Sequence, residues 1–180
     1  AFLISRKVDM QVFILGKTKT GKSTLAKIVK EFDYTIYEAG SWPREEFSTI
    51  NTGSLVLFSQ EFKENLTQYA LSKLKEDSYY SVKKYEKFIK ENKGKKLIVG
   101  VRNPDDFLQM LRKDNKNLVI FIKSQKQFEG SLELFEEGLK IIHDYLDWKK
   151  RLGNPIDVVE ISEKDIHDED FVIQLLKGKL

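Results

Sequence analysis

A glycine- and lysine-rich turn, between a short apolar run and a helical pattern, carries the residues best suited to chemistry. It reads G-x-x-x-x-G-K-S from Gly16 to Ser23, directly after the apolar run 10–15. The glycines allow a tight turn with inward-pointing N–H groups, and the helix that follows adds the positive end of its dipole. Lys22 supplies a cation for the β- and γ-phosphates, and the Ser23 hydroxyl suits Mg²⁺. This predicts a phosphate-binding loop (P-loop) for ATP or GTP, made of Gly16, Lys17, Thr18, Lys19, Thr20, Gly21, Lys22, Ser23 and Thr24.

Apolar runs alternate with helical patterns along the chain, as in an α/β fold with a parallel sheet. The expected strands are residues 10–15, 34–39, 96–101, 118–122 and 156–161, and the run 55–58 is either a sixth strand or part of a helix. The expected helices are residues 22–32, 61–75, 78–92, 104–113, 130–152 and 165–177. We therefore expect one three-layer P-loop domain over residues 1–180, with about five strands, helices on both faces, and the nucleotide at the carboxyl ends of the strands.

The composition excludes several classes of protein. Hydrophobic residues make up 41% of the chain and charged residues 33%, which is typical of a globular domain. No apolar run suggests a membrane helix, and the first residues do not form a secretory signal. The absence of cysteine excludes disulfides, thiolate metal sites and cysteine catalysis. Together with the nucleotide site, this predicts a cytoplasmic protein without a membrane partner.

The motifs that define regulatory GTPases are missing. Their guanine-reading Asn-Lys-x-Asp would fall at Ile122-Lys123-Ser124-Gln125, which has no aspartate. Their Asp-x-x-Gly after the third strand is also absent, because that strand reads Ile-Val-Gly-Val-Arg over 98–102. The chain is short for a mechanical ATPase. Of the P-loop classes considered, this leaves the small-molecule kinases, which use ATP and Mg²⁺. The net charge of +3 is compatible with phosphorylated substrates and does not require a nucleic-acid partner.

Two segments resemble nucleoside monophosphate kinases, including the phage-type deoxynucleoside monophosphate kinases. Residues 38–44, EAGSWPR, are similar to a strand that ends in Thr-Gly-Asp and is soon followed by an arginine, although Ser41 replaces the aspartate. Residues 97–107, LIVGVRNPDDF, are similar to the Asp-Gly-x-Arg segment. The resemblance implies that Arg44 and Arg102 hold the acceptor phosphate, within an acceptor region of about 38–92. The implied acceptor-binding residues are Gly40, Ser41, Trp42, Arg44 and Arg102.

The resemblance also implies a small helical lid over about residues 128–154. A lid excludes water and brings cations to the transition state. Arg151 is the candidate lid arginine, and would share catalysis with Lys22 and Arg102. The other cations of this segment include Lys140, Lys149 and Lys150. A surface helix with solvated lysines is the alternative.

One departure concerns the metal, because Val99 stands where relatives carry an acid that organises Mg²⁺ through water. Three explanations are open: Glu38 or Asp105 takes the role of this acid, the metal relies on Ser23 and the phosphates alone, or the protein is a weak or inactive kinase. The departure at Val99 also supports an alternative function, a nucleotide-binding regulator or scaffold without turnover. A kinase acting on polynucleotide ends or DNA bases is a further alternative, and the chain is either a monomer or a homodimer.

Several other residues have ordinary structural explanations. His143 and His167 lack metal-ligand spacing and are expected at the surface. The pair Asp105-Asp106 suits the first turn of a helix better than a metal site. Trp42 is suited equally to stacking on a base and to core packing. The tyrosines Tyr79, Tyr80 and Tyr85 are expected on a helix face against the sheet rather than in an acceptor pocket.

Overall fold

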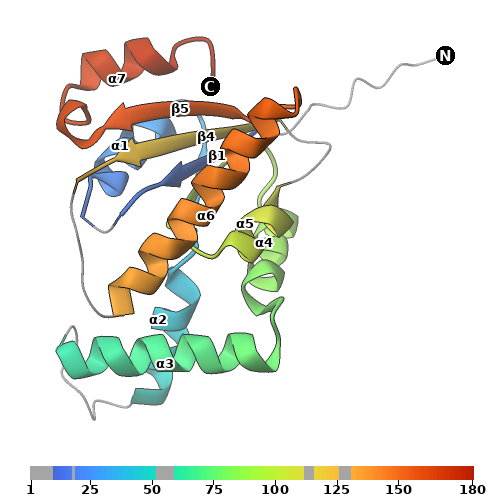
Figure 1. The fold of residues 1–180 in the computed structure, drawn as a ribbon. Helices are drawn as coiled ribbons and strands as arrows, with labels where there is room; N and C mark the ends of the chain where they lie inside the picture. Colours follow the sequence, from blue (N-terminus) through green and yellow to red (C-terminus); the bar gives the residue numbers. More distant parts are fainter. Residues whose placement is uncertain (1–9, 18, 52–58, 112–115, 126–130) are drawn as a thin grey trace.

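In the described residues of the computed structural model, which is drawn in Figure 1, five parallel strands form one sheet in the order β2-β3-β1-β4-β5. The model describes residues 10–17, 19–51, 59–111, 116–125 and 131–180. The strands are β1 (Met10–Leu15), β2 (Thr35–Glu38), β3 (Lys96–Val99), β4 (Lys116–Lys123) and β5 (Asp157–Ser162). Strand β1 lies in the centre, so the P-loop that follows it emerges in the middle of the carboxyl edge.

Helices cover both faces of the sheet, which confirms the predicted α/β architecture. The α-helices are α1 (Lys22–Lys30), α2 (Ser41–Asn51), α3 (Gln60–Glu76), α4 (Tyr80–Glu91), α5 (Pro104–Met110), α6 (Ser131–Arg151) and α7 (Glu169–Leu176), and a 3₁₀ helix spans Glu163–Asp165. Helices α1 and α7 bury Leu25 and Val172 in one core, with Val12 and Ile14 of β1. Helices α4, α5 and α6 bury side chains in a second core with Phe13 of β1.

The five predicted strands and six predicted helices all occur, with boundaries shifted by a few residues. Residues 55–58 lie outside the described residues. Helix α2 was not predicted, and it carries Pro43 in its first turn. A proline is tolerated there, since the first turn of a helix has no backbone acceptor for its N–H groups. The ring of Phe47 then packs against Phe62 and Tyr69, which holds α2 on α3.

A carboxylate ties together the three helices of the predicted acceptor region. Glu46 of α2 accepts hydrogen bonds from the hydroxyls of Tyr69 (2.9 Å) and Tyr80 (2.8 Å) and pairs with the Lys84 ammonium at 2.8 Å. Desolvation opposes its ionisation, but the hydrogen bonds from Lys84, Tyr80 and Tyr69 outweigh it and lower the pKa of Glu46. Because Arg44 lies on α2 as well, this cluster fixes the helix that presents it.

The helical lid predicted over residues 128–154 is not seen in α6, which is a layer of the core. Leu139, Ile142 and Leu146 in the middle of α6 are buried in the second core. A helix held by that much apolar surface cannot swing freely over the phosphates. Residues 126–130 lie outside the described residues. No helix within the described ranges has the length and apolar character needed to cross a membrane.

Candidate nucleotide and phosphoryl-acceptor site

The backbone between β1 and α1 forms the tight turn that the motif predicts. Gly21 caps α1 with a left-handed φ of 100°, which side-chain-bearing residues rarely adopt. At Gly16 a Cβ would lie 3.0 Å from Ile122 Cβ and 3.1 Å from Thr20 Oγ1, so the loop is closely packed. The Thr20 hydroxyl donates to the Lys17 carbonyl at 2.7 Å. Thr18 lies outside the described residues.

The Lys22 side chain lies across this loop. Its ammonium donates to the carbonyls of Gly16 (3.0 Å) and Lys17 (2.6 Å). Desolvation by burial, and then repulsion from Arg102, lower the pKa of Lys22 to about 8. The protonated form of Lys22 is therefore destabilised in the unliganded protein, and a bound polyphosphate would stabilise it.

Two further cations extend from Lys22 across the carboxyl edge. Arg102 follows β3, and its burial, together with repulsion from Arg44, lowers its pKa. Arg44 is exposed on α2, where its Nε donates to the Gly40 carbonyl at 3.3 Å and its guanidinium lies 4.0 Å from the Glu38 carboxylate. Electrostatic repulsion thus links Lys22 to Arg102, and Arg102 to Arg44, although the three side chains come from separate segments. We refer to these three side chains as the cation row.

The residues that could hold Mg²⁺ lie beside this row. Ser23 and Thr24 are exposed in the first turn of α1. Val99 is apolar, but its Cα partner on β2 is Glu38, so an acid stands at the same level one strand away, with Ile14 of β1 on the other side. In the part of the chain that is described, no three His, Asp or Glu residues form a ready-made metal site. A metal here would therefore take ligands from Ser23 and the phosphates, with Glu38 as the nearby carboxylate.

Arg151 does not belong to this site. It ends α6, and α6 connects the carboxyl end of β4 to the amino end of β5, because the two strands are parallel. A helix of 21 residues spans about 30 Å. Arg151 therefore lies at the amino edge, opposite the P-loop, as Figure 1 shows for the end of α6. This corrects its prediction as a lid arginine.

Trp42 is a core residue in this structure. It is 5% exposed, its indole N–H donates to Ser81 Oγ at 3.1 Å, and its ring meets Tyr80 edge-on at 4.9 Å. No face of the indole is open for a nucleobase. Of the two predicted roles, core packing is the one observed, and we remove Trp42 from the acceptor-binding residues. Gly40 and Ser41 remain near the end of β2, where Ser41 Oγ donates to the Glu38 carbonyl at 2.7 Å.

The acidic pair after Arg102 begins α5, as predicted. Asn103 Oδ1 accepts from the backbone N–H groups of Asp105 (2.9 Å) and Asp106 (3.3 Å). The burial of Asp106 was not expected, and it raises the pKa of this carboxyl to about 6, although a hydrogen bond with Ser81 opposes the shift. Nothing in the sequence pattern separates the buried Asp106 from the exposed Asp105. Asp106 is therefore a titratable group four residues from Arg102 that sequence reasoning missed.

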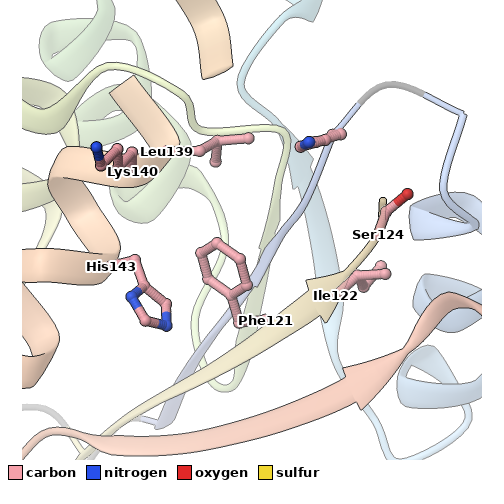
Figure 2. Close-up of a pocket in the computed structure, with 7 residues that line it drawn as sticks. Phe121, Ile122, Ser124, Leu139, Lys140 and His143 are labelled. Atoms are coloured by element: carbon pink, nitrogen blue, oxygen red, sulfur yellow. The ribbon is translucent and has the colours of Figure 1, made fainter. Parts of the chain in front are cut away.

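A pocket of about 180 Å³ opens between the carboxyl end of β4 and α6, next to the P-loop (Figure 2). Phe121, Ile122 and Leu139 give it an apolar wall. Polar groups also line it, namely Lys17, Ser124, Lys140 and His143. His143 Nε2 lies 3.1 Å from Glu160 Oε1, so it is an anchored surface histidine, as expected. The pocket suits a compact group that combines an apolar face with negative charge.

Helix α6 touches the loop that carries Arg102 through Gly138. A Cβ at this position would overlap the Arg102 carbonyl oxygen and lie 3.5 Å from Pro104 Cδ. The backbones can meet only because residue 138 has no side chain. Gly138 therefore sets how closely α6 supports Arg102.

Gly138→Ala is expected to lower the stability of the fold. The added methyl meets backbone rather than a flexible side chain, and overpacking of this kind costs about 1–3 kcal/mol, which is a fall of several degrees in Tm. Thermal unfolding followed by circular dichroism measures it. Gly40→Ala is the matched control, because its Cβ would make only an ordinary 3.7 Å contact with Arg44. Equal Tm values for the two variants would contradict the close approach.

The affinity for ATP is expected to fall above pH 8. Lys22 has a pKa of about 8 in the unliganded protein, and bound phosphates would raise it, so binding above pH 8 takes up one proton. The Kd for ATP should therefore rise by up to about tenfold per pH unit above 8 and stay flat just below it. Titration calorimetry from pH 7 to pH 10 tests this, and Lys22→Met should remove the rise in Kd above pH 8. If the rise in Kd persists in Lys22→Met, another titrating group causes it.

Solved structures with a TM-score above 0.5 share this fold at low sequence identity. A shikimate kinase from Aquifex aeolicus aligns with a TM-score of 0.51 and 11% identity, over 94% of this chain and 97% of that chain. A chain from the PezAT chromosomal toxin–antitoxin system of Streptococcus pneumoniae gives a TM-score of 0.52 and 14% identity, over 89% of this chain and 69% of that chain. A gluconokinase from Sinorhizobium meliloti aligns at 0.45 and 12% identity, over 95% and 93% of the two chains. No protein-family model and no curated protein matches the chain.

Proposed function

We propose that the protein is an ATP-dependent kinase that transfers the γ-phosphoryl group to a small phosphorylated acceptor, a nucleoside or deoxynucleoside monophosphate. The observation that carries this is the cation row. Burial lowers the pKa values of Lys22 and Arg102, and repulsion between Lys22 and Arg102 and between Arg102 and Arg44 adds to the shifts. Protein groups held in mutual repulsion at a phosphate-binding loop fit two polyanions that meet there.

The order Lys22, Arg102, Arg44 supports a different role for each cation. Lys22 and the P-loop would hold the triphosphate, Arg102 would bridge donor and acceptor, and exposed Arg44 would hold the acceptor phosphate. An oxygen of the acceptor phosphate would form the new bond to the γ-phosphorus as the bond to the ADP oxygen breaks. Because this reaction needs little covalent help from the protein, positioning and charge stabilisation suffice. Mg²⁺ held at Ser23 would supply further neutralisation of the phosphates.

The pocket between β4 and α6 is the place that we propose for the body of the acceptor. Because Trp42 of α2 is buried, a nucleobase cannot stack on its ring. The pocket between β4 and α6, in contrast, is lined by Lys17 of the P-loop itself. Gly138 and Leu139 are neighbours on α6, so the Arg102 loop and this pocket are adjacent. An acceptor could therefore place its anionic group at Arg102 and its apolar face against Phe121 and Leu139.

The test is ADP release from ATP·Mg²⁺ in the presence of each ribo- and deoxyribonucleoside monophosphate. Acceptor-dependent turnover that Arg44→Ala and Arg102→Ala both weaken would support the proposal. Turnover with a DNA 5′ end, and with no monophosphate, would replace it by a polynucleotide kinase. ATP binding without any product would favour a nucleotide-binding regulator, in which Glu38 does not replace the acid missing at Val99.

A further inference from the structure

An apolar stripe runs along the outer side of α6 and continues to Leu152, which follows the helix directly. Ile141, Trp148 and Leu152 are exposed by 56%, 52% and 60% of their surface. Tyr145 completes the stripe, and its ring lies 5.9 Å from that of Trp148. The four residues recur at intervals of four, three and four, the spacing of a coiled-coil seam. Helix α6 crosses the near side of the molecule in Figure 1. We refer to Ile141, Tyr145, Trp148 and Leu152 as the α6 stripe.

The stripe is symmetric about its own midpoint, which lies between Leu146 and Asp147. When a second α6 is laid antiparallel about this point, Ile141 of one copy faces Leu152 of the other, and Tyr145 faces Trp148. A twofold axis makes such a contact self-complementary, since each pair occurs twice. The aromatic pair then occupies the centre, where interfaces concentrate their binding energy.

The charges beside the stripe fit the same arrangement. Asp144 and Arg151 are both exposed and are separated by two helical turns, so they lie on one flank of the stripe. In antiparallel pairing, Asp144 of one copy lies within about 3 Å, measured along the helix axis, of the level of Arg151 in the other. A parallel pairing would instead place this flank of the two copies on opposite sides of the seam, so that Asp144 of one copy could not meet Arg151 of the other.

We propose that the protein forms a homodimer through antiparallel packing of the α6 stripe of two copies. The occupant is a second copy because both the apolar pairs and the charged pair complement themselves under one twofold axis. This inference does not depend on the proposed function. The active edge stays free, since the P-loop follows β1 at the carboxyl edge whereas the stripe extends toward the amino edge.

Light scattering during size exclusion, at about 1 to about 200 µM protein, tests the interface. We expect a mass that rises toward twice the 21.0 kDa of one chain. Trp148→Glu should keep the protein at one chain without lowering its Tm, because the side chain it replaces is half exposed. Phe171→Glu on α7, which is 44% exposed, is the matched control and should leave the dimer intact. A monomer at every concentration, or a dimer that Trp148→Glu does not affect, would overturn the proposal.

Charge exchange tests the pairing of Asp144 with Arg151. Asp144→Arg and Arg151→Asp should each raise the dimer Kd several-fold, and the double variant should restore it. Independent, additive losses in the double variant would reject this contact.

Cysteine cross-linking tests the direction of the helices, because the chain has no cysteine of its own. When Ile141→Cys and Leu152→Cys proteins are mixed and oxidised, the mixed disulfide should dominate. Two Ile141→Cys chains would hold their sulfurs about 16 Å apart along the axis, which no disulfide can span. Lys87→Cys on α4 is the control and should remain uncross-linked. Dominant 141–141 disulfides would show parallel packing and overturn the proposal.

Discussion

Lys22→Ala is expected to reduce phosphoryl transfer by about 10³-fold, the largest effect of any single change in this chain. The Lys22 ammonium already lies over the loop, hydrogen-bonded to the Gly16 and Lys17 carbonyls. It is pre-positioned for charge that grows on the γ-phosphate and the leaving oxygen, so its loss acts on the transition state more than on ATP binding. Steady-state ADP release, together with the Kd for ATP from calorimetry, separates the two effects.

Lys27→Ala is the matched control for that experiment. Lys27 lies on the same helix and is exposed, away from the loop. It should keep full activity, and both variants should unfold at temperatures within a few degrees of wild type, because each leaves the apolar face of α1 intact. A Lys22→Ala protein with near wild-type turnover would refute the assignment of the P-loop.

The sequence was sufficient for the P-loop and the sheet because their signals are local. The pattern from Gly16 to Ser23 fixes the turn geometry, and the apolar run before it needs no information from elsewhere in the chain. The pair Asp105-Asp106, predicted in the first turn of a helix, is an equally local signal. Each depends on backbone preferences of a few adjacent residues, which tertiary packing does not override here.

What the sequence could not supply are properties that arise between elements. Trp42 is buried because Ser81 and Tyr80 of a later segment cover it. Asp106 differs from Asp105 only in which side of α5 meets the core. Arg151 shows a different error, since the parallel order of β4 and β5 already required the end of α6 to lie at the far edge. A motif-based assignment of a lid arginine neglected the length of the helix between them.

The neighbour of Val99 also appears only when the strands are paired. Glu38 and Val99 are far apart in the sequence, yet the register of β2 and β3 places them at the same level. The missing acid in one strand therefore has a counterpart in the next. This juxtaposition is the reason we favour a catalytic protein over a regulator that only binds nucleotide.

Arg102→Ala is expected to lower kcat/KM for the acceptor by about 10²-fold, with a smaller change in the Kd for ATP. Arg102 is half-buried after β3, and it is coupled to Lys22 on one side and to Arg44 on the other. It is therefore the group best placed to offset charge between two phosphates. Arg102→Lys should recover only part of the loss, because an ammonium cannot present the planar fork that holds two oxygens at once.

Arg102→Ala is also expected to raise the pKa of Lys22, and this second effect makes the prediction specific. Removing Arg102 removes the repulsion that helps to hold the pKa of Lys22 near 8, although burial, the larger cause, remains. The pH at which ATP binding begins to weaken should therefore move upward in Arg102→Ala, while Lys87→Ala on α4 leaves it unchanged. A loss of acceptor turnover without this upward shift would mean that Arg102 acts at a distance from the P-loop lysine, and the cation row would not function as one site.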